Sequence, residues 1–188
     1  MRLPLFVASA LLSVSIAAHA SPVVYTFTGD FSGTLGTTSF SDDFGTFTFT
    51  GDTSTVVGSG GYYYNTAGVS TITLEGLGTA TFLSSTFGAE SQSNAGAFYD
   101  SATDFGVGTE SSAFAAYSLT APFGPITGSF ITNGAIAEST SLGDLSIASE
   151  TGETTFTAAA AATPEPSSLI LLGTGLLGFA GAVRKRFA

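Results

Sequence analysis

Two short runs of this chain alternate aromatic and hydroxyl side chains with a period of two residues. They are Tyr-Thr-Phe-Thr at 25–28 and Thr-Phe-Thr-Phe-Thr at 46–50. Successive side chains of a β-strand point to opposite faces, so the alternation predicts strands with one buried and one solvated face. Six further strands are expected from similar runs at 69–74, 79–83, 114–119, 126–131, 144–148 and 154–157.

Turn residues separate these runs, and between the terminal segments no stretch shows a convincing helical period. The clearest hairpin signal is Asn133-Gly134, which lies between the run at 126–131 and Ile136. Many short strands at irregular spacing predict an all-β fold, a β-sandwich of jelly-roll-like or immunoglobulin-like type, with an irregular barrel as the alternative. The expected core consists of Phe27, Phe47, Phe49, Ile72, Leu74, Phe82, Phe114 and Phe130.

Charge is distributed very unevenly along the chain. The four basic residues are Arg2 and the cluster Arg184, Lys185 and Arg186, and all 14 carboxylates lie between Asp30 and Glu165. The middle of the chain is therefore purely anionic. Nucleic-acid binding is excluded there, because phosphates must be neutralised by Lys or Arg.

The same region also lacks most catalytic side-chain types. His19 is the one histidine, and the chain has no Cys or Trp. Activated Ser or Thr nucleophiles, zinc sites and phosphoryl transfer all require groups that are absent. A carboxylate-pair glycosidase is the one enzyme class that the composition allows, and we expect a non-enzymatic protein.

The N-terminus has the three parts of a signal peptide: basic Arg2, an apolar run at 3–17, and an A-x-A site formed by Ala18 and Ala20 before Ser21. The apolar run is shorter than the roughly 20 residues that a membrane-spanning helix prefers. Cleavage is therefore expected before Ser21, which makes 1–20 a removable signal and 21–157 an exported domain.

The C-terminus has a second tripartite pattern. A small-residue linker at 158–163 precedes Pro164-Glu165-Pro166, an uncharged stretch at 167–183 and the basic cluster at 184–186. The stretch at 167–183 is expected to span the membrane, with the basic cluster on the cytoplasmic side. Its G-x-G-x-x-G run at 173–178 lacks the following strand and acidic residue of a dinucleotide site.

This pattern, carried by Pro164, Glu165 and Pro166, the Leu/Gly-rich helix and the terminal basic cluster, closely resembles the PEP-CTERM sorting segment. The sorting segment that residues 164–188 resemble is also known as the C-terminal domain of an ice-binding protein. The resemblance implies a Gram-negative-type bacterium and an exosortase, a membrane enzyme that processes such segments. It also implies delivery, after transient inner-membrane anchoring, to the cell surface or extracellular matrix.

Two places could hold calcium, the one metal ion whose all-oxygen ligands this region supplies. They are Asp42-Asp43 and the loop from Asp100 to Asp104. Neither has the spacing of a known calcium loop, and Asp is an ordinary turn residue. No cofactor is expected beyond such a Ca²⁺ ion.

Three consecutive tyrosines, Tyr62, Tyr63 and Tyr64, are the most unusual local feature. Exposed tyrosines can stack on sugar rings, since each has a flat apolar face and a hydroxyl. The alternative, favoured by the two-residue period, is a strand in which Tyr63 packs inward or Tyr62 and Tyr64 share a buried face. Thr-x-Thr pairs at 46–50 and 71–73 suggest ice-binding arrays, but the chain has no repeat and a solvated strand face explains them equally well.

The expected function is therefore that of an exported surface or matrix protein, associated with biofilm or exopolysaccharide. This matrix role is implied by the resemblance alone. The alternative is a calcium-dependent or glycan-binding adhesion module. The less favoured alternative is a glycosidase, which would place two carboxyl groups across one cleft.

Overall fold

The computed structural model describes residues 22–134 and 136–161, which form an all-β domain. Its strands are β1 (Pro22–Leu35), β2 (Thr38–Asp52), β3 (Val57–Ser59), β4 (Tyr62–Asn65), β5 (Gly68–Leu74), β6 (Gly78–Thr81), β7 (Phe87–Gln92), β8 (Ala95–Asp100), β9 (Gly106–Glu110), β10 (Phe123–Thr132), β11 (Glu138–Thr140) and β12 (Gly143–Ala160). Two short 3₁₀-helices, η1 (Thr53–Thr55) and η2 (Ser112–Ala116), lie between strands. The all-β prediction is confirmed.

The long strands follow the aromatic–hydroxyl alternation seen in the sequence. Along β1, half-buried and buried residues alternate from Pro22 to Gly29, and β2 has the same pattern around Phe47 and Phe49. β1 lies between β2 and β12 and pairs with both in antiparallel fashion. The period-two pattern therefore predicted correctly which face of β1 and β2 is buried.

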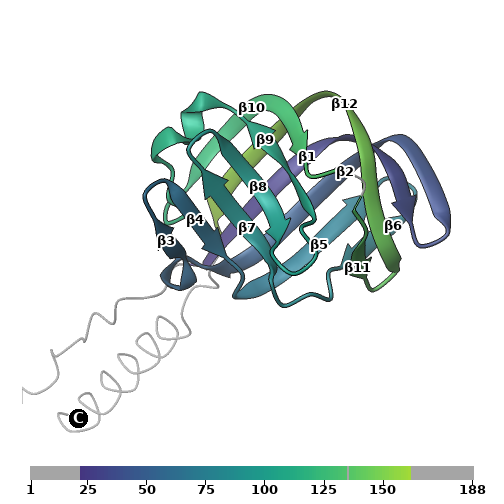
Figure 1. Cartoon of the computed structure of the whole chain (residues 1–188), viewed down its shortest axis with the longest axis horizontal. Helices are drawn as coiled ribbons and strands as arrows, with labels where there is room; N and C mark the ends of the chain where they lie inside the picture. The colour runs from purple at the N-terminus through teal and green to yellow at the C-terminus, as the bar shows by residue number, and fades with distance from the viewer. Residues whose placement is uncertain (1–21, 135, 162–188) are drawn as a thin grey trace, which may run out of the picture.

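The strands form one strongly curled sheet, ordered β3-β4-β7-β8-β9-β10-β12-β1-β2-β5-β6, with β11 paired to β12. The strand β10 joins the two halves, because residues 123–128 pair with β12 and residues 129–132 pair with β9. A sandwich would have two separate sheets, whereas this half-barrel curls until its halves face each other (Figure 1).

The core fills the space between the two halves and is mostly phenylalanine. The ring of Phe98 in β8 packs 5.9 Å from that of Phe47 in β2 and 6.4 Å from that of Phe27 in β1. Seven of the expected core residues are buried; Phe130 is half-buried but still stacks on Phe27 at 6.4 Å. Tilted aromatic pairs of this kind stabilise by about 1 kcal/mol each beyond their burial.

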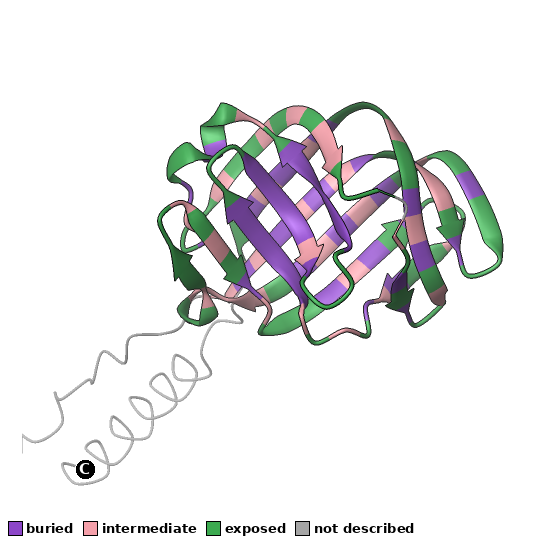
Figure 2. Cartoon of the chain, in the orientation of Figure 1, coloured by how far each residue is buried: buried purple, intermediate pink, exposed green. Residues whose placement is uncertain are grey.

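Strands β7, β8 and β9 are buried on both faces, which is why they appear as a continuous buried band in Figure 2. Their inner faces carry core residues such as Phe87 and Phe98. Their outer faces carry small residues, including Gly88, Ala97 and Gly106, so little side-chain surface is exposed there. Such strands do not alternate between apolar and polar residues, and the sequence analysis did not predict them.

Two local predictions are wrong. Residues 114–119 do not form a strand, because Phe114 and Tyr117 both turn into the core, and a spacing of three fits the 3₁₀-helix η2. Asn133-Gly134 does not close a hairpin onto β10, because the preceding residues 129–132 pair with β9. The chain continues instead to β11, which pairs with β12.

Both ends of the described domain lie together. The amide of Ala161 donates a hydrogen bond to the carbonyl of Pro22 at 2.9 Å, and Val23 pairs with Ala160. Strand β12 therefore extends to Ala160, three residues into the segment expected to be a linker (158–163), and Ala158 is buried. The expected signal peptide, the cleavage residues predicted for it (Ala18, Ala20 and Ser21) and the helix expected at 167–183 lie outside the described residues.

Candidate ligand-binding groove

The outer face of the half-sheet β4 to β10 carries three tyrosines. Tyr62 and Tyr64 project from this face of β4 with exposed fractions of 43% and 41%, and their ring centroids are 6.1 Å apart. Tyr63, between them, is half-buried and packs on the core. Tyr99 of β8 is the third tyrosine on the outer face.

Glycines open the space around Tyr99. In the sheet register Tyr99 lies between Gly88 of β7 and Gly106 of β9, so neither paired residue has a side chain beside its ring. A methyl group at Gly106 would lie 3.2 Å from Cδ2 of Tyr99 and 3.2 Å from Nδ2 of Asn133. Glycine within a strand often marks the close approach of a ligand or another backbone.

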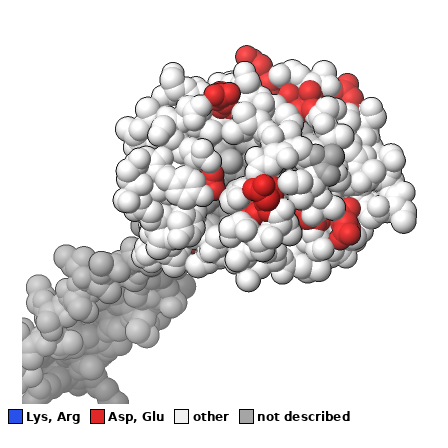
Figure 3. Space-filling model, in the orientation of Figure 1, with Lys and Arg blue, Asp and Glu red and all other residues white. Residues whose placement is uncertain are grey.

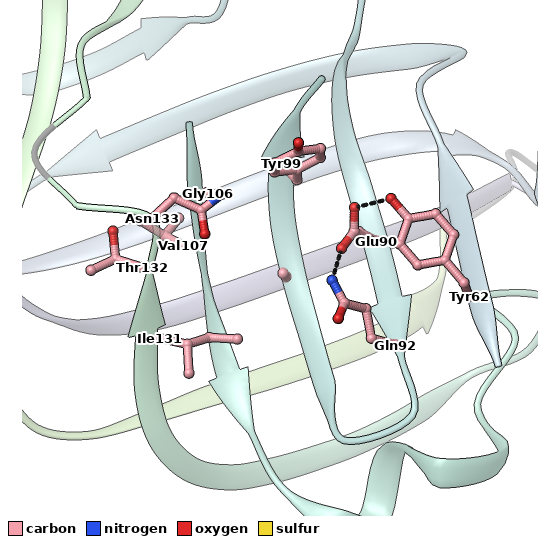
Figure 4. A pocket seen from close by; sticks show the side chains of 10 residues that line it. Tyr62, Glu90, Gln92, Tyr99, Gly106, Val107, Ile131, Thr132 and Asn133 are labelled. Carbon is pink, nitrogen blue, oxygen red and sulfur yellow. Dashed lines mark hydrogen bonds between the residues drawn. The ribbon is translucent and has the colours of Figure 1, made fainter. Parts of the chain in front are cut away.

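Two adjoining hollows result, with volumes of about 200 Å³ and about 250 Å³. Both are lined by Tyr62, Glu90 and Tyr99, so they form one depression, which we call the tyrosine groove. The first hollow has Tyr62, Glu90 and Gln92 on one side, and Ile131, Thr132 and Asn133 on the other (Figure 4). The second extends toward Tyr64, Thr86 and Ser101.

Glu90 is the central polar residue of the groove. Its side chain is only 3% exposed, and its Oε2 accepts a hydrogen bond of 2.9 Å from the Tyr62 hydroxyl. Its Oε1 accepts a second hydrogen bond from the side-chain amide of Gln92 (Figure 4). Burial and this bond to Glu90 raise the pKa of Tyr62, which therefore stays protonated and donates.

The far wall of the groove is held by Asp104. Its Oδ1 accepts hydrogen bonds from the Tyr99 hydroxyl at 2.9 Å and from Nδ2 of Asn133 at 3.2 Å. The bond to Asp104 raises the pKa of Tyr99. Asp104 has φ of 64°, a left-handed conformation that Asp tolerates, and it closes the loop after β8. The rings of Tyr62 and Tyr99 are thus both tethered through their hydroxyl groups.

The surface around the groove is anionic. In the described residues, carboxylates are scattered over the face seen in Figure 3 and no Lys or Arg is present. Each of the two hollows is lined by a single carboxylate, Glu90. The groove therefore offers hydrogen-bond acceptors, aromatic faces and amide groups, but no cation.

The residues considered for calcium do not gather into one site. Asp42 is exposed in the β1–β2 hairpin, where its backbone amide donates to Oγ of Ser32, and Asp43 is its neighbour in β2. Asp104 is exposed and accepts a hydrogen bond from the Tyr99 hydroxyl, whereas Asp100 is fully buried. Across residues 22–134 and 136–161, no group of three or more His, Cys, Asp or Glu side chains is placed to hold a metal ion.

Asp100 instead belongs to a buried pair with Glu138 of β11. The two side chains are 0% and 1% exposed. Oδ1 of Asp100 accepts from the Thr86 hydroxyl and the Ala102 amide, Oε2 of Glu138 accepts from the Thr103 hydroxyl, and Oδ2 of Asp100 has no hydrogen-bond partner. Burial raises the pKa of Glu138. For Asp100 burial acts in the same direction, but hydrogen bonds from Ser84, Thr86 and the Ala102 amide outweigh it and lower the pKa. Burial and the neighbouring Asp100 charge therefore favour the protonated form of Glu138 more than water does.

The outer face of the other half-sheet carries two rows of threonines. One row crosses six strands and the other five; we call them together the threonine face, formed by Thr127, Thr155, Thr28, Thr46, Thr73 and Thr79, and by Thr157, Thr26, Thr48, Thr71 and Thr81. The rows arise from strand pairing, not from a sequence repeat. The sheet curls beneath them, whereas an ice surface is flat (Figure 1).

The comparisons with known proteins concern the C-terminus. Residues 162–186 match the family model described as the PEP-CTERM protein-sorting motif. The chain carries a PEP-CTERM sorting motif. This confirms the resemblance carried by Pro164, Glu165, Pro166 and the basic cluster Arg184, Lys185 and Arg186, all of which lie outside the described residues. No curated protein and no solved structure matches the chain.

The PEP-CTERM motif implies an exported protein that an exosortase processes and sorts to the membrane or cell surface. It begins one residue after Ala161, whose amide bonds to Pro22. Within the described part of the chain, no helix is long and apolar enough to cross a membrane.

Only part of the groove is indicated by the sequence. The consecutive tyrosines predict Tyr62 and Tyr64 as ligand contacts, but no local pattern marks Glu90, Gln92, Tyr99 or Asn133 as groove residues. In β7 and β8 small residues surround isolated polar and aromatic ones, and this pattern is typical of an open sheet face. It indicates a groove only once β7 and β8 are known to be neighbouring strands.

Proposed function

We propose that the exported domain is a non-enzymatic glycan-binding module of the cell surface or extracellular matrix. The observation that carries the proposal is the tyrosine groove, in which the tethered rings of Tyr62 and Tyr99 border a floor of glycine and alanine. The PEP-CTERM motif implies sorting to the membrane or cell surface, and that location supports the same proposal.

The groove has the chemistry that a sugar ring requires. A tyrosine ring offers an apolar face to the C–H groups of a pyranose, and the groove rim supplies Gln92 and Asn133, which both donate and accept hydrogen bonds. Each hollow is smaller than the roughly 300–1,000 Å³ pockets that enclose drug-sized ligands. The groove therefore suits successive single rings of a chain lying across the surface.

The carboxylates support a binding role over hydrolysis. A glycosidase needs two carboxyl groups facing one cleft, roughly 5 to 9.5 Å apart. Each hollow has one carboxylate in its lining, and the close pair of Asp100 and Glu138 lies inside the protein, away from any sugar.

The test is retention of the exported protein by exopolysaccharide prepared from the same cells. Tyr99→Ala should lower the retained fraction about tenfold, in line with the loss of one stacking ring. Phe44→Ala is the matched control, because Phe44 is also an exposed aromatic residue (49%) but lies on β2, outside the groove. Equal retention of wild type and Tyr99→Ala would refute the proposal.

A further inference from the structure

We infer that the tyrosine groove selects sugars that carry an ammonium group, that is, amino sugars without an N-acetyl group. This inference rests on the proposed glycan-binding function and names its substrate class. The inference depends on the negative charge of the groove, whereas the proposed glycan binding depends on stacking against the tyrosine rings.

The first step is the missing counter-charge of Glu90. A carboxylate that is 97% buried is normally paired with a cation, because burial of an unpaired charge is costly. Here Glu90 has two neutral donors, the Tyr62 hydroxyl and the Gln92 amide. Residues 21–183 contain no Lys, Arg or His, so no side chain of the folded domain can pair with it.

The second step is the aromatic surroundings of this charge. Tyr62 donates to Glu90, Tyr64 pairs with Glu90 in the β4–β7 register, and Tyr99 lines both hollows beside it. A ligand cation over the face of a tyrosine ring is attracted by about 0.5–2 kcal/mol. Aromatic rings grouped around a carboxylate are thus a binding arrangement for an organic cation.

The third step is the match of donors and acceptors. An ammonium group has three donors and no acceptor. Glu90, the one carboxylate in the lining of both hollows, supplies acceptor oxygens and is held in place by Tyr62. An acidic sugar would meet these same oxygens and the negative field of a domain without Lys or Arg. The expected order of affinity is therefore amino sugar, then neutral sugar, then acidic sugar.

The experiment compares oligosaccharides of one length by calorimetry on the exported protein. A β-1,4-linked glucosamine tetramer should bind about tenfold more tightly than its fully N-acetylated form, as expected for one added charge-assisted contact. Raising the NaCl concentration from about 50 mM to about 500 mM should reduce this preference, because salt screens the charge.

Glu90→Gln should abolish the preference for the glucosamine tetramer over its N-acetylated form, because it removes the negative charge of the groove. Asp42→Asn is the matched control, because it removes one carboxylate from the exposed hairpin and should keep the full preference. If Glu90→Gln fails to fold, the wild-type affinities for the two tetramers and their salt dependence still decide whether the groove prefers the ammonium sugar.

The outcomes separate the two proposals. Equal or tighter binding of the N-acetylated tetramer overturns the inference and leaves the glycan-binding function standing. A lysine tetrapeptide that binds more tightly than the glucosamine tetramer overturns the sugar class. No binding of any oligosaccharide or of the native exopolysaccharide overturns both.

Discussion

The Tyr62 hydroxyl, at the start of β4, donates a hydrogen bond of 2.9 Å to Oε2 of Glu90 in β7. The two residues are 28 positions apart in the sequence, yet this contact joins the exposed tyrosine pair to the one carboxylate of the groove. It fixes an aromatic ring and a negative charge side by side on an otherwise uncharged floor.

Tyr62→Phe tests this contact. Loss of the donor leaves the Glu90 carboxylate with Gln92 alone, and we expect the free energy of unfolding to fall by about 1–2 kcal/mol at pH 7. The raised pKa of Tyr62 adds a pH dependence: the stability that its protonated form contributes is present below about pH 10 and is lost as pH rises further. Urea unfolding at pH 7 and pH 11 measures both effects. An unchanged urea midpoint at pH 7 would mean that the hydrogen bond contributes nothing.

Glu138→Gln tests the buried pair. The folded pKa of Glu138 is raised, so its contribution to stability is present below the unfolded value of about 4.3 and is lost as pH rises through the folded pKa. Asp100 has a lowered pKa and acts oppositely, losing its contribution only as pH falls through that value. The glutamine amide can donate permanently to Asp100. The melting temperature of the variant relative to wild type should therefore rise between pH 4.5 and pH 8.

A pH-independent difference in melting temperature would contradict this account of the pair.

Calcium supplies a second check, because a bound Ca²⁺ ion would neutralise the negative charge of the Asp100 and Glu138 carboxyl groups, as a proton does. A shift of several degrees in melting temperature on adding about 5 mM CaCl₂ would support the calcium site considered from the sequence. We expect a shift of less than about 1 °C.

Gly106→Ala tests the floor of the groove. The added methyl would press on the side chains of Tyr99 and Asn133, both of which can shift by a few tenths of an ångström. Oligosaccharide affinity should fall about tenfold with little loss of stability. Gly88→Ala is the contrasting variant, because its methyl would meet the backbone oxygen of Asn65 at 2.0 Å and should destabilise the fold itself. Undiminished binding by Gly106→Ala would exclude the first hollow as the site.

Sorting is tested by the intact mass of the protein recovered from the cell surface and medium. With the exosortase gene present, we expect both the first 20 residues and the segment after about Pro166 to be absent, which would confirm the signal peptide and the processing together. Without that gene the C-terminal segment should remain. A protein that keeps residues 169–188 in both strains would be a simple anchored protein and would contradict exosortase processing.

Strands with one buried and one solvated face could be predicted from the sequence, whereas strands buried on both faces could not. Phe27, Phe47 and Phe49 alternate with threonine, so the sequence predicted their strands and their burial correctly. Strands such as β7 combine core residues on one face with Gly88 and Glu90 on the other, and a period-two search does not detect them. The position of β7 and β8 depends instead on a contact inside the curled sheet, where the rings of Phe87 and Phe98 pack against each other.

The candidate site was less predictable for a related reason. Tyr62 and Tyr64 were visible as a local run, but Glu90 and Tyr99 reach the same groove only through the β4-β7-β8 register. The same holds for the threonine face, whose rows come from pairing of six strands. Strand order is a long-range property that no local pattern in this chain specifies.

The most direct measurement is hydrogen exchange of the exported protein with and without a saturating glucosamine tetramer, read by mass spectrometry of peptic peptides. The account predicts that protection gained on binding is confined to peptides covering β4, β7, β8, residues 100–107 and residues 131–133, which border the tyrosine groove. Protection confined to β1, β2 and β5 beneath the threonine face, or no gain in protection anywhere, would contradict it.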